Sequence, residues 1–402
     1  MQGPGAQGGA AAVSLAVRLP SRLQSCESRV SFRPARPRGW TARRGNPSRP
    51  EMPLAEGLWA PLSRDGLRGR CLFLGLALAA HAGGDTAPAA PPDPAGVDAA
   101  VKKGVKWLRD EQDPAGGFGT GPGETALALL ALRHSGVPAM DPACERAATR
   151  LARLLPDGTV YGAALGTLAL LEQGGHPKEV ERLVQDLVRG QCRNGQWTYA
   201  YRNTATKRGG DNSNTQLASL ALAVARARRI AVPDETFARL DAFLVGSQNA
   251  DGGFGYSYNQ RCSSYASMTA GGAMMLALCG AKDRAEVKRA FAWLARDFDP
   301  ANNRGAADAF GKGKGRRGNN FWKHYWLWSL ERACGAAGVK DLEGRDWYAL
   351  GARHLLDRQK EDGGWRDPEQ PLQATCFALL FLNRATVRAL TPAPVTTTPG
   401  GR

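Results

Sequence analysis

The stretch Lys103–Phe118, KGVKWLRDEQDPAGGF, contains the pattern that decides the fold: a Gln, three residues, a Gly, one more residue and then an aromatic residue. The pattern occurs four times, at Gln112–Phe118, Gln191–Trp197, Gln248–Phe254 and Gln359–Trp365. A variable loop and an apolar run follow each copy. Because one such unit cannot bury its apolar face alone, the repeated units are expected to stack into one body.

Each residue type in the first copy has a physical role. Trp107 and Leu108 are expected to end a helix that has an apolar face. The side chain of Gln112 can reach backbone groups that lack partners at the end of a neighbouring helix. Gly116 allows a positive φ in a tight turn, and Phe118 can cover that turn. The pattern therefore predicts a tight turn that fastens one helix to the next.

The apolar runs that follow the turns predict a second set of helices. Glu124–Leu132, ETALALLAL, is apolar on all sides, which is typical of a helix buried all round. Equivalent runs follow the other three turns, at Asn214–Leu222, Met268–Leu278 and Ala374–Leu382. A Thr stands near the start of each of the four runs: Thr125, Thr215, Thr269 and Thr375.

Two degenerate units complete the series. Leu151–Leu171 keeps a turn and an apolar helix, and Arg289–Leu294 keeps the first half of the pattern, with Phe298 in place of the Gln. The inner helix of the second unit would be His324–Glu331. Charged segments are then outer helices, for example Pro177–Val188 and Lys282–Arg296. About six helix pairs between residues 97 and 388 predict an all-α fold, an α/α barrel or toroid without an extended sheet.

The charge distribution does not favour a nucleic-acid partner. The formal net charge is +16, but residues 1–70 hold 12 Lys and Arg against 4 Asp and Glu, so half of the excess lies there. Residues 1–51 are rich in Gly, Pro, Arg and Ala and are expected to be disordered, or to be translated upstream of a true start at Met52.

Residues 52–82 have the order of an export signal. Arg64, Arg68 and Arg70 are basic, Cys71–Ala80 is apolar, and residues 80–82 form a small-x-small cleavage site. The apolar run is too short for a stable membrane anchor, although a buried helix is the alternative interpretation. We expect a mature chain that begins near Gly83 and is exported to the periplasm or cell envelope. Residues 83–96 are then a linker, and residues 389–402 a disordered tail.

The cysteines do not indicate a metal site. The six that follow the predicted signal include no CxxC pair and no zinc spacing. Cys279, Cys334 and Cys376 lie in apolar runs and are expected in the core. Cys192 and Cys262 lie in predicted loops and could pair in an oxidising compartment.

The repeat resembles the QW motif of the squalene and oxidosqualene cyclases, whose barrel also occurs in protein prenyltransferase β subunits. Lys103–Phe118 matches this motif with Phe for the final Trp, and the resemblance covers residues 97–388. It implies a toroid with an isoprenoid or other long apolar ligand in a central cavity. The activities that it implies are a cyclase-like isomerase or a prenyltransferase-like transferase.

The chain departs from these families at their chemical motifs. No DxDD or DCTAE acid motif occurs, and no thioester GCGEQ. Ser264–Ala270 lacks the Asp-x-Cys zinc ligands of the prenyltransferases, and His324 is offset from their His. We therefore expect no zinc and no other cofactor. A non-catalytic binding module and a polysaccharide-acting α/α-barrel enzyme remain alternatives.

In such barrels the starts of the inner helices face the cavity, which selects the polar candidates. Asp211, within Gly210–Gln216, is a candidate general acid whose pKa burial would raise; the alternative is a helix N-cap. Asn212 and Asn214 are candidate ligand-binding neighbours. His324 is the second catalytic candidate. We expect Asp211, Asn212, Asn214, His324 and Tyr325 to line one end of a shared cavity.

The remaining candidates are aromatic or charged. Trp322, Tyr325 and Trp326 could stabilise a carbocation through cation–π attraction, or form an ordinary aromatic core. Arg261 and Tyr265 resemble the diphosphate-binding Arg and Tyr of prenyltransferases, and Glu124 is a carboxylate at an inner-helix start. Gly311–Gly318, GKGKGRRG, could contact an anionic substrate or the membrane surface, or be a solvated loop.

Overall fold

The computed structural model describes residues 92–202, 209–257, 262–310, 322–366 and 370–390. All of them belong to one compact unit, Gly57–Arg402. Their regular structure is helical, and the β-pairing among them is limited to isolated bridges. No helix in these ranges is both long and apolar enough to cross a membrane.

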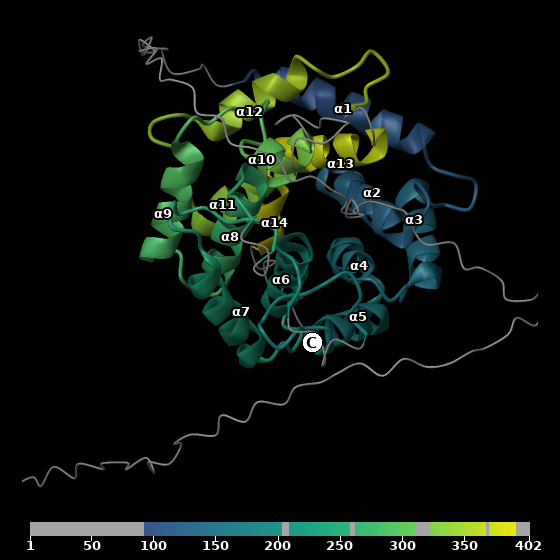
Figure 1. The fold of residues 1–402 in the computed structure, drawn as a ribbon. Helices are drawn as coiled ribbons and strands as arrows, with labels where there is room; N and C mark the ends of the chain where they lie inside the picture. Colours follow the sequence, from purple (N-terminus) through teal and green to yellow (C-terminus); the bar gives the residue numbers. More distant parts are fainter. Residues whose placement is uncertain (1–91, 203–208, 258–261, 311–321, 367–369, 391–402) are drawn as a thin grey trace, which may run out of the picture. The chain divides into compact units, whose positions relative to one another are not determined.

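The helices form two concentric rings (Figure 1). The outer ring contains α1 (Pro94–Asp110), α3 (Pro142–Leu154), α5 (Pro177–Arg189), α7 (Asp234–Ser247), α9 (Ala285–Ala295) and α12 (Trp347–Leu356). The inner ring contains α2 (Pro122–His134), α4 (Val160–Gln173), α6 (Asn212–Ala227), α8 (Ala266–Leu278), α11 (Lys323–Ala337) and α13 (Pro371–Leu382). Each inner helix contacts the next, and α13 contacts α2, which closes the ring. The predicted toroid of six helix pairs is confirmed.

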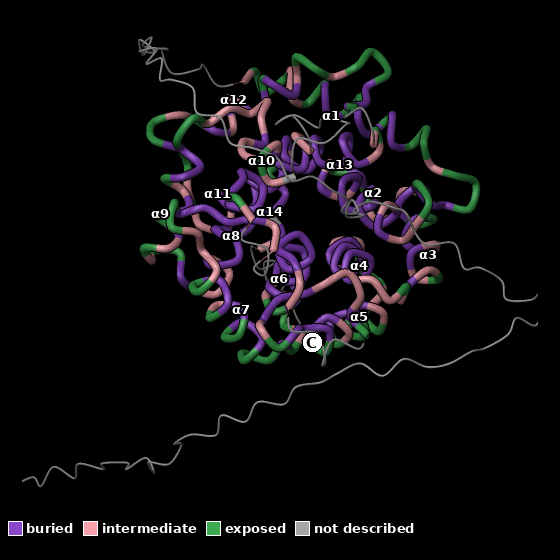
Figure 2. Tube along the Cα trace, in the orientation of Figure 1, coloured by how far each residue is buried: buried purple, intermediate pink, exposed green. Residues whose placement is uncertain are grey.

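Burial separates the rings as the sequence predicts (Figure 2). In α4 every residue from Val160 to Leu170 is buried. Outer helix α5 buries only Val180, Leu183, Val184 and Leu187, the spacing of a single helix face. The inner helices are therefore the core, and the outer helices cover it with one apolar face each.

The repeated Gln fastens consecutive outer helices. Nε2 of Gln112 donates to the carbonyl of Gly116 at 3.1 Å and to that of Ala143, in the first turn of α3, at 2.9 Å. A carbonyl oxygen in the first turn of a helix already accepts a hydrogen bond from an amide within that helix, so the Gln side chain donates to its second lone pair. The sequence predicts that the Gln binds backbone groups without partners at a helix end, and the structure corrects this role. The other three repeats make the same two bonds: Gln191 to Gly195 and Thr236, Gln248 to Gly252 and Glu286, and Gln359 to Gly363 and Ala100. The last pair joins the turn after α12 to α1.

The turn glycine and the Thr of the inner helix complete the unit. Gly195 has φ +94°, and a Cβ there would lie 2.3 Å from the carbonyl oxygen of Arg239 in α7. The backbone N–H of Trp197 donates to the hydroxyl of Thr215 at 3.0 Å. The aromatic residues of the other turns bond to Thr125, Thr269 and Thr375 in the same way. This bond explains why a Thr opens each apolar run.

The structure corrects two predicted boundaries. Helix α1 begins at Pro94, inside the predicted linker 83–96, because Asp93 caps it by accepting from the amides of Ala95 and Gly96. Helix α14 (Ala385–Leu390) extends into the predicted tail 389–402; its six residues are too few to show a helical period. A further short helix, α10 (Ala306–Phe310), precedes α11. The segments 1–51 and 52–82 lie outside the described residues, so their assignments stay predictions.

The cysteines of the described residues carry no disulfide. No disulfide is formed by Cys144, Cys192, Cys262, Cys279, Cys334 or Cys376. Cys334 and Cys376 are buried, as predicted, whereas Cys279 is half-buried at the end of α8. Cys192 and Cys262 do not form the disulfide that an oxidising compartment would allow.

Candidate functional site

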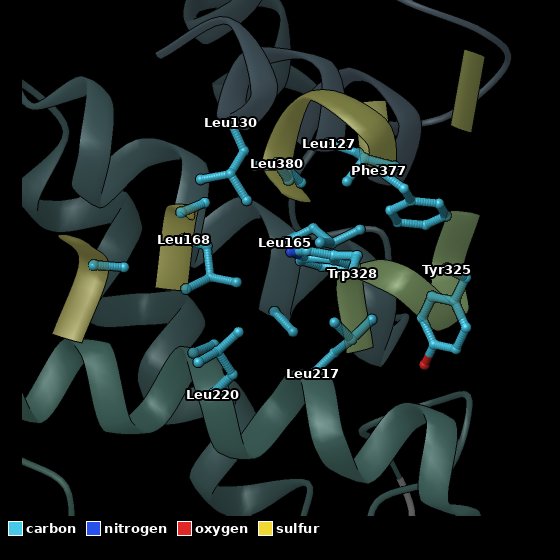
Figure 3. Packing of buried hydrophobic residues seen from close by; sticks show 14 of the residues in the cluster. Leu127, Leu130, Leu165, Leu168, Leu217, Leu220, Tyr325, Trp328, Phe377 and Leu380 are labelled. Atoms are coloured by element: carbon cyan, nitrogen blue, oxygen red, sulfur yellow. The ribbon is translucent and has the colours of Figure 1, made fainter. Parts of the chain in front are cut away.

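Apolar side chains of the inner helices gather at the centre of the ring (Figure 3). Most come as pairs three residues apart, which places both members on one helix face. We call these residues the axial cluster: Leu127 and Leu130 of α2, Leu165 and Leu168 of α4, Leu217 and Leu220 of α6, Tyr325 and Trp328 of α11, and Phe377 and Leu380 of α13. None of them is more than 4% exposed.

The aromatic candidates divide between the centre and the periphery. Tyr325 belongs to the axial cluster, where its ring centre lies 5.5 Å from that of Phe377. Phe377 stacks on Trp328 at 5.0 Å. Trp326 instead donates from Nε1 to the carbonyl of Asp299 at 3.3 Å and packs edge-on against Phe298, in the segment after outer helix α9. The structure thus brings Tyr325, and not Trp326, to the axis.

Two other aromatic candidates precede inner helices. Trp322 is half-buried just before α11 and has a left-handed backbone, with φ +55°. Tyr265 precedes α8, is buried, and donates its amide to the carbonyl of Phe254 at 3.2 Å. Tyr265 is therefore held by the turn of its own repeat.

Helix α14 closes the axis at the C-terminal ends of the inner helices. It contacts α6, α11 and α13 and covers a cavity of about 20 Å³. The cavity is lined by the axial residues Leu130, Leu168, Leu220, Trp328 and Leu380, by Ala385, Thr386 and Ala389 of α14, and by His134, Leu171, Glu172, Val224 and Arg228. This volume holds about one water molecule, so an isoprenoid does not fit this cavity in the present arrangement.

Glu331 fastens α14 to the inner ring. Its Oε1 accepts from the amide of Thr386 at 3.0 Å, and its Oε2 accepts from the Thr386 hydroxyl at 2.8 Å. Glu331 is fully buried. Burial raises the pKa of Glu331 to about 7, against the opposing effects of the two Thr386 bonds and of the charges on Arg332 and Arg384. A titratable contact therefore holds the cover of the axis.

Asp211 lies at the opposite end, where the inner helices begin, and it caps α6. Oδ1 accepts from the amides of Ser213 and Asn214 at 3.0 and 2.9 Å and from the Ser213 hydroxyl at 2.6 Å. Oδ2 accepts from Nδ2 of Asn214 at 2.9 Å. Burial raises the pKa of Asp211, and these four bonds act in the opposite direction. The N-cap interpretation is confirmed, and the carboxylate acts as an acceptor in this geometry.

Five buried or half-buried tyrosines surround Asp211. The Tyr161 hydroxyl donates to the Ser213 hydroxyl at 2.6 Å, and Ser213 in turn donates to Asp211. The hydroxyls of Tyr199 and Tyr256 lie 2.6 Å apart. Burial raises the pKa of each tyrosine, and the negative charge of Asp211 raises it further: Tyr161, Tyr199, Tyr256, Tyr265 and Tyr325. The N-terminal end of the axis is thus a polar group of phenols around one carboxylate.

The positions of three of these tyrosines could have been found in the sequence, because they stand at fixed distances from the repeat pattern although they are not part of it. Tyr199 and Tyr256 each follow the aromatic residue of a turn by two positions, after Trp197 and Phe254. Tyr161 is the second residue of inner helix α4. The repeat itself therefore places these hydroxyls at the starts of the inner helices.

The remaining polar candidates make structural links. Nδ2 of Asn212 donates to the carbonyl of Gly255 at 2.9 Å, and its Oδ1 accepts from Gln196 at 3.0 Å. Glu124 accepts from Nε2 of Gln373 at 2.7 Å and from the amide of Gly121 at the start of α2. These contacts join neighbouring inner-helix starts.

His324 is buried in the first turn of α11. Its charge is one of the influences that lower the pKa of His354 in outer helix α12, after burial and the charges of Arg358 and Lys323. His324 thus opens inner helix α11, and the expectation that it lines one end of a cavity with Asp211 stays a prediction. Arg261 and Gly311–Gly318 lie outside the described residues.

The part of the chain that the structure describes contains no group of three or more His, Cys, Asp or Glu side chains that could hold a metal ion.

A family model described as the prenyltransferase alpha-alpha toroid domain matches residues 95–306. The chain belongs to this family. The match spans the helix pairs from α1 to the segment after α9, and the closed ring of six pairs agrees with it. No curated protein sequence matches the chain.

Solved structures of similar shape include members with different activities. The apo type II terpene cyclase MstE from Scytonema is 14% identical over 74% of this chain and 100% of that one, with a TM-score of 0.49. A variant of MstE in complex with geranylgeranyl dihydroxybenzoate, its substrate, is 15% identical over 74% and 98%, with a TM-score of 0.48. A glycosidase in complex with glucose is 13% identical over 74% and 96%, with a TM-score of 0.43. Similarity at this level does not assign an activity to a toroid.

Proposed function

We propose that this toroid binds one long apolar ligand of the isoprenoid class along its axis. The axial cluster supports this proposal because five inner helices direct hydrocarbon and aromatic side chains to the same region. An apolar chain buried there gains about 25 cal/mol for each Å² of surface removed from water. Trp328 and Phe377 offer flat faces to unsaturated carbons.

The way in which α14 closes the axis is the observation that carries the proposal. A solid core needs no cover, but here a helix of six residues lines a small, partly open cavity at the end of the axial cluster. A helix of this length is not stable by itself, so its position depends on tertiary contacts such as those with Glu331. Displacement of α14 would open the axis to a ligand without breaking the ring.

Binding is favoured over catalysis by the state of the buried acids. Alkene protonation needs an acid whose proton is directed at the ligand. Both oxygens of Asp211 accept hydrogen bonds from α6, and both oxygens of Glu331 lie within hydrogen-bond distance of Thr386, so neither carboxyl group directs a proton along the axis. Cleavage of a glycan would need a pair of carboxyl groups beside the bond that breaks, and an apolar axis does not suit a sugar.

Export to the periplasm or envelope is part of the same proposal. Its support is the basic, apolar and small-x-small order of residues 64–82. N-terminal sequencing of protein from its own host is expected to find a start near Gly83, and an intact Met1 or Met52 would contradict it. Contact with the membrane surface, through which a long apolar ligand would arrive, belongs to this proposal as well.

Ligand binding can be tested on the full-length protein. Native mass spectrometry of protein purified from its host is expected to show one bound lipid-sized molecule. After delipidation, titration with geranylgeraniol is expected to change the intrinsic tryptophan fluorescence, to which Trp328 contributes, with one site per chain. The variant Leu168→Trp fills the cavity under α14 and is expected to weaken binding at least about tenfold, which corresponds to about 1.4 kcal/mol.

The matched control is Val245→Trp, which adds the same side chain at an exposed position of α7. It is expected to bind like the wild type. A wild-type protein that binds no C20 isoprenoid alcohol or acid, or a Leu168→Trp variant that folds and binds them normally, would overturn the proposal.

A further inference from the structure

A fully buried guanidinium lies among the axial aromatic residues. Arg332 of α11 has its Cζ 3.9 Å from the centre of the Trp328 ring and 5.5 Å from that of the Tyr325 ring. Its Nη2 donates to Oε1 of Gln216 and to the hydroxyl of Ser329, both at 2.9 Å. Its Nε donates to the carbonyl of Trp328 at 3.4 Å. Arg332 therefore belongs to the axis and not to the outer surface.

The partners of Arg332 are all neutral. No carboxylate of the described residues forms an ion pair with it. Its Nη1 is buried without a hydrogen bond of normal geometry, and the neighbouring Tyr325 side chain raises the pKa of Arg332 against the effect of burial. The neighbouring Glu331 is engaged with Thr386, and the oxygens of Asp211 are engaged with α6. A guanidinium stays protonated in proteins, so Arg332 keeps its charge although burial lowers its pKa.

A buried charge of this kind is costly for folding. Buried arginines are normally paired with acids, because desolvation of the charge is otherwise uncompensated. Stacking on Trp328 offsets part of that cost. An arginine kept in the core at such a cost, with one donor group unused, is typical of a site that receives an anionic oxygen.

We propose that Arg332 binds the carboxylate of a long-chain acid, so that the ligand of the toroid is an isoprenoid or similar acid and not a neutral hydrocarbon. This inference rests on the proposed function and names the head group of its ligand. The Nη1 group of Arg332 can donate charge-assisted hydrogen bonds to a carboxylate oxygen, and one arginine suits a single negative charge. A diphosphate carries more charge than one arginine can balance, and the described residues gather no metal-binding group to assist. The apolar chain would then lie along the axial cluster.

The test compares two ligands that differ only in the head group. Delipidated full-length protein is titrated with geranylgeranoic acid and with geranylgeraniol at neutral pH. The wild type is expected to bind the acid at least about tenfold more tightly, as one charge-assisted hydrogen bond allows. The variant Arg332→Met is expected to bind both with the affinity that the wild type has for the alcohol. Its melting temperature is expected to equal or exceed that of the wild type, because it removes an unpaired buried charge.

The matched control is Arg304→Met. Arg304 also stacks on an indole, with its Cζ 3.7 Å from the centre of the Trp293 ring, but it lies beside outer helix α9 and pairs with Asp297. It is expected to keep the preference for the acid. Equal wild-type affinities for acid and alcohol would overturn the inference and leave the proposed function standing, even if Arg332→Met failed to fold. Binding of neither ligand would overturn both. A folded Arg332→Met variant that still prefers the acid would overturn the inference alone.

Discussion

At the scale of the residue, the fully buried Glu331 makes stability depend on pH. The pKa of Glu331 is raised from 4.5 to about 7, so the folded protein keeps a proton that the unfolded chain has lost between these pH values. The stabilising contribution is therefore complete below about pH 4.5 and disappears as the pH rises through 7. A shift of this size corresponds to about 3 kcal/mol. We expect Glu331→Gln, which stays neutral and can still bond to Thr386, to remove this loss of stability between pH 5 and 8. Urea unfolding at several pH values measures the free energy of unfolding of both proteins. Equal pH profiles for the variant and the wild type would contradict this prediction.

Individual residues are also where sequence reasoning reached its limit. Glu331 and Arg332 stand as two charges inside a run of buried residues in α11, which the sequence shows. The direction of each side chain depends on how α11 is rotated against its neighbours, and no local pattern specifies that rotation. Asp211 is a candidate from sequence because capping and catalysis favour the same residue type at a helix start. The four hydrogen bonds that its carboxylate oxygens accept in the structure distinguish the capping role from a catalytic one.

At the scale of the element, the repeated turn was predictable because its contacts are local and recur in the sequence. Its Gln gives a sharp prediction. Gln191 donates to the carbonyls of Gly195 and Thr236 and accepts from Arg239 through Oε1. In Gln191→Glu one oxygen can still accept from Arg239, but the other would face two carbonyl oxygens with no proton between them. We expect a loss of about 2 kcal/mol of unfolding free energy at pH 7, the cost of buried groups left unsatisfied.

Acidification provides the control for this variant. At pH 4 the introduced carboxyl group, once protonated, can donate to one of the two carbonyls, so the difference between variant and wild type is expected to shrink. Chemical denaturation at both pH values measures this difference in unfolding free energy. A difference that stays constant with pH, or is absent at pH 7, would show that the Gln only fills space between α5 and α7.

At the scale of the whole molecule, the ring and its cover are expected to have separate stabilities. The six inner helices close on one another, whereas α14 contacts α6, α11 and α13 at one end. The sequence repeat predicted the ring because four of the six units contain the full pattern and the other two keep part of it. Helix α14 lies outside the repeats, and its place depends on a buried Glu331. Local opening of such a segment costs less than global unfolding.

The variant Thr386→Val tests this separation. It keeps the shape of the side chain but removes the hydroxyl that donates to Oε2 of Glu331 at 2.8 Å. We expect hydrogen exchange in residues 385–390 to become about tenfold faster, as loss of one hydrogen bond to a buried acid allows, while α4 exchanges at the wild-type rate. Association of an apolar ligand is expected to accelerate by a similar factor, because opening of α14 admits it. Thr236→Val is the matched control, since the Thr236 hydroxyl in α7 is buried without a hydrogen-bond partner. Faster exchange in both α4 and α14 would mean that α14 does not open separately from the core. The ligand would then have to enter the axis at another place.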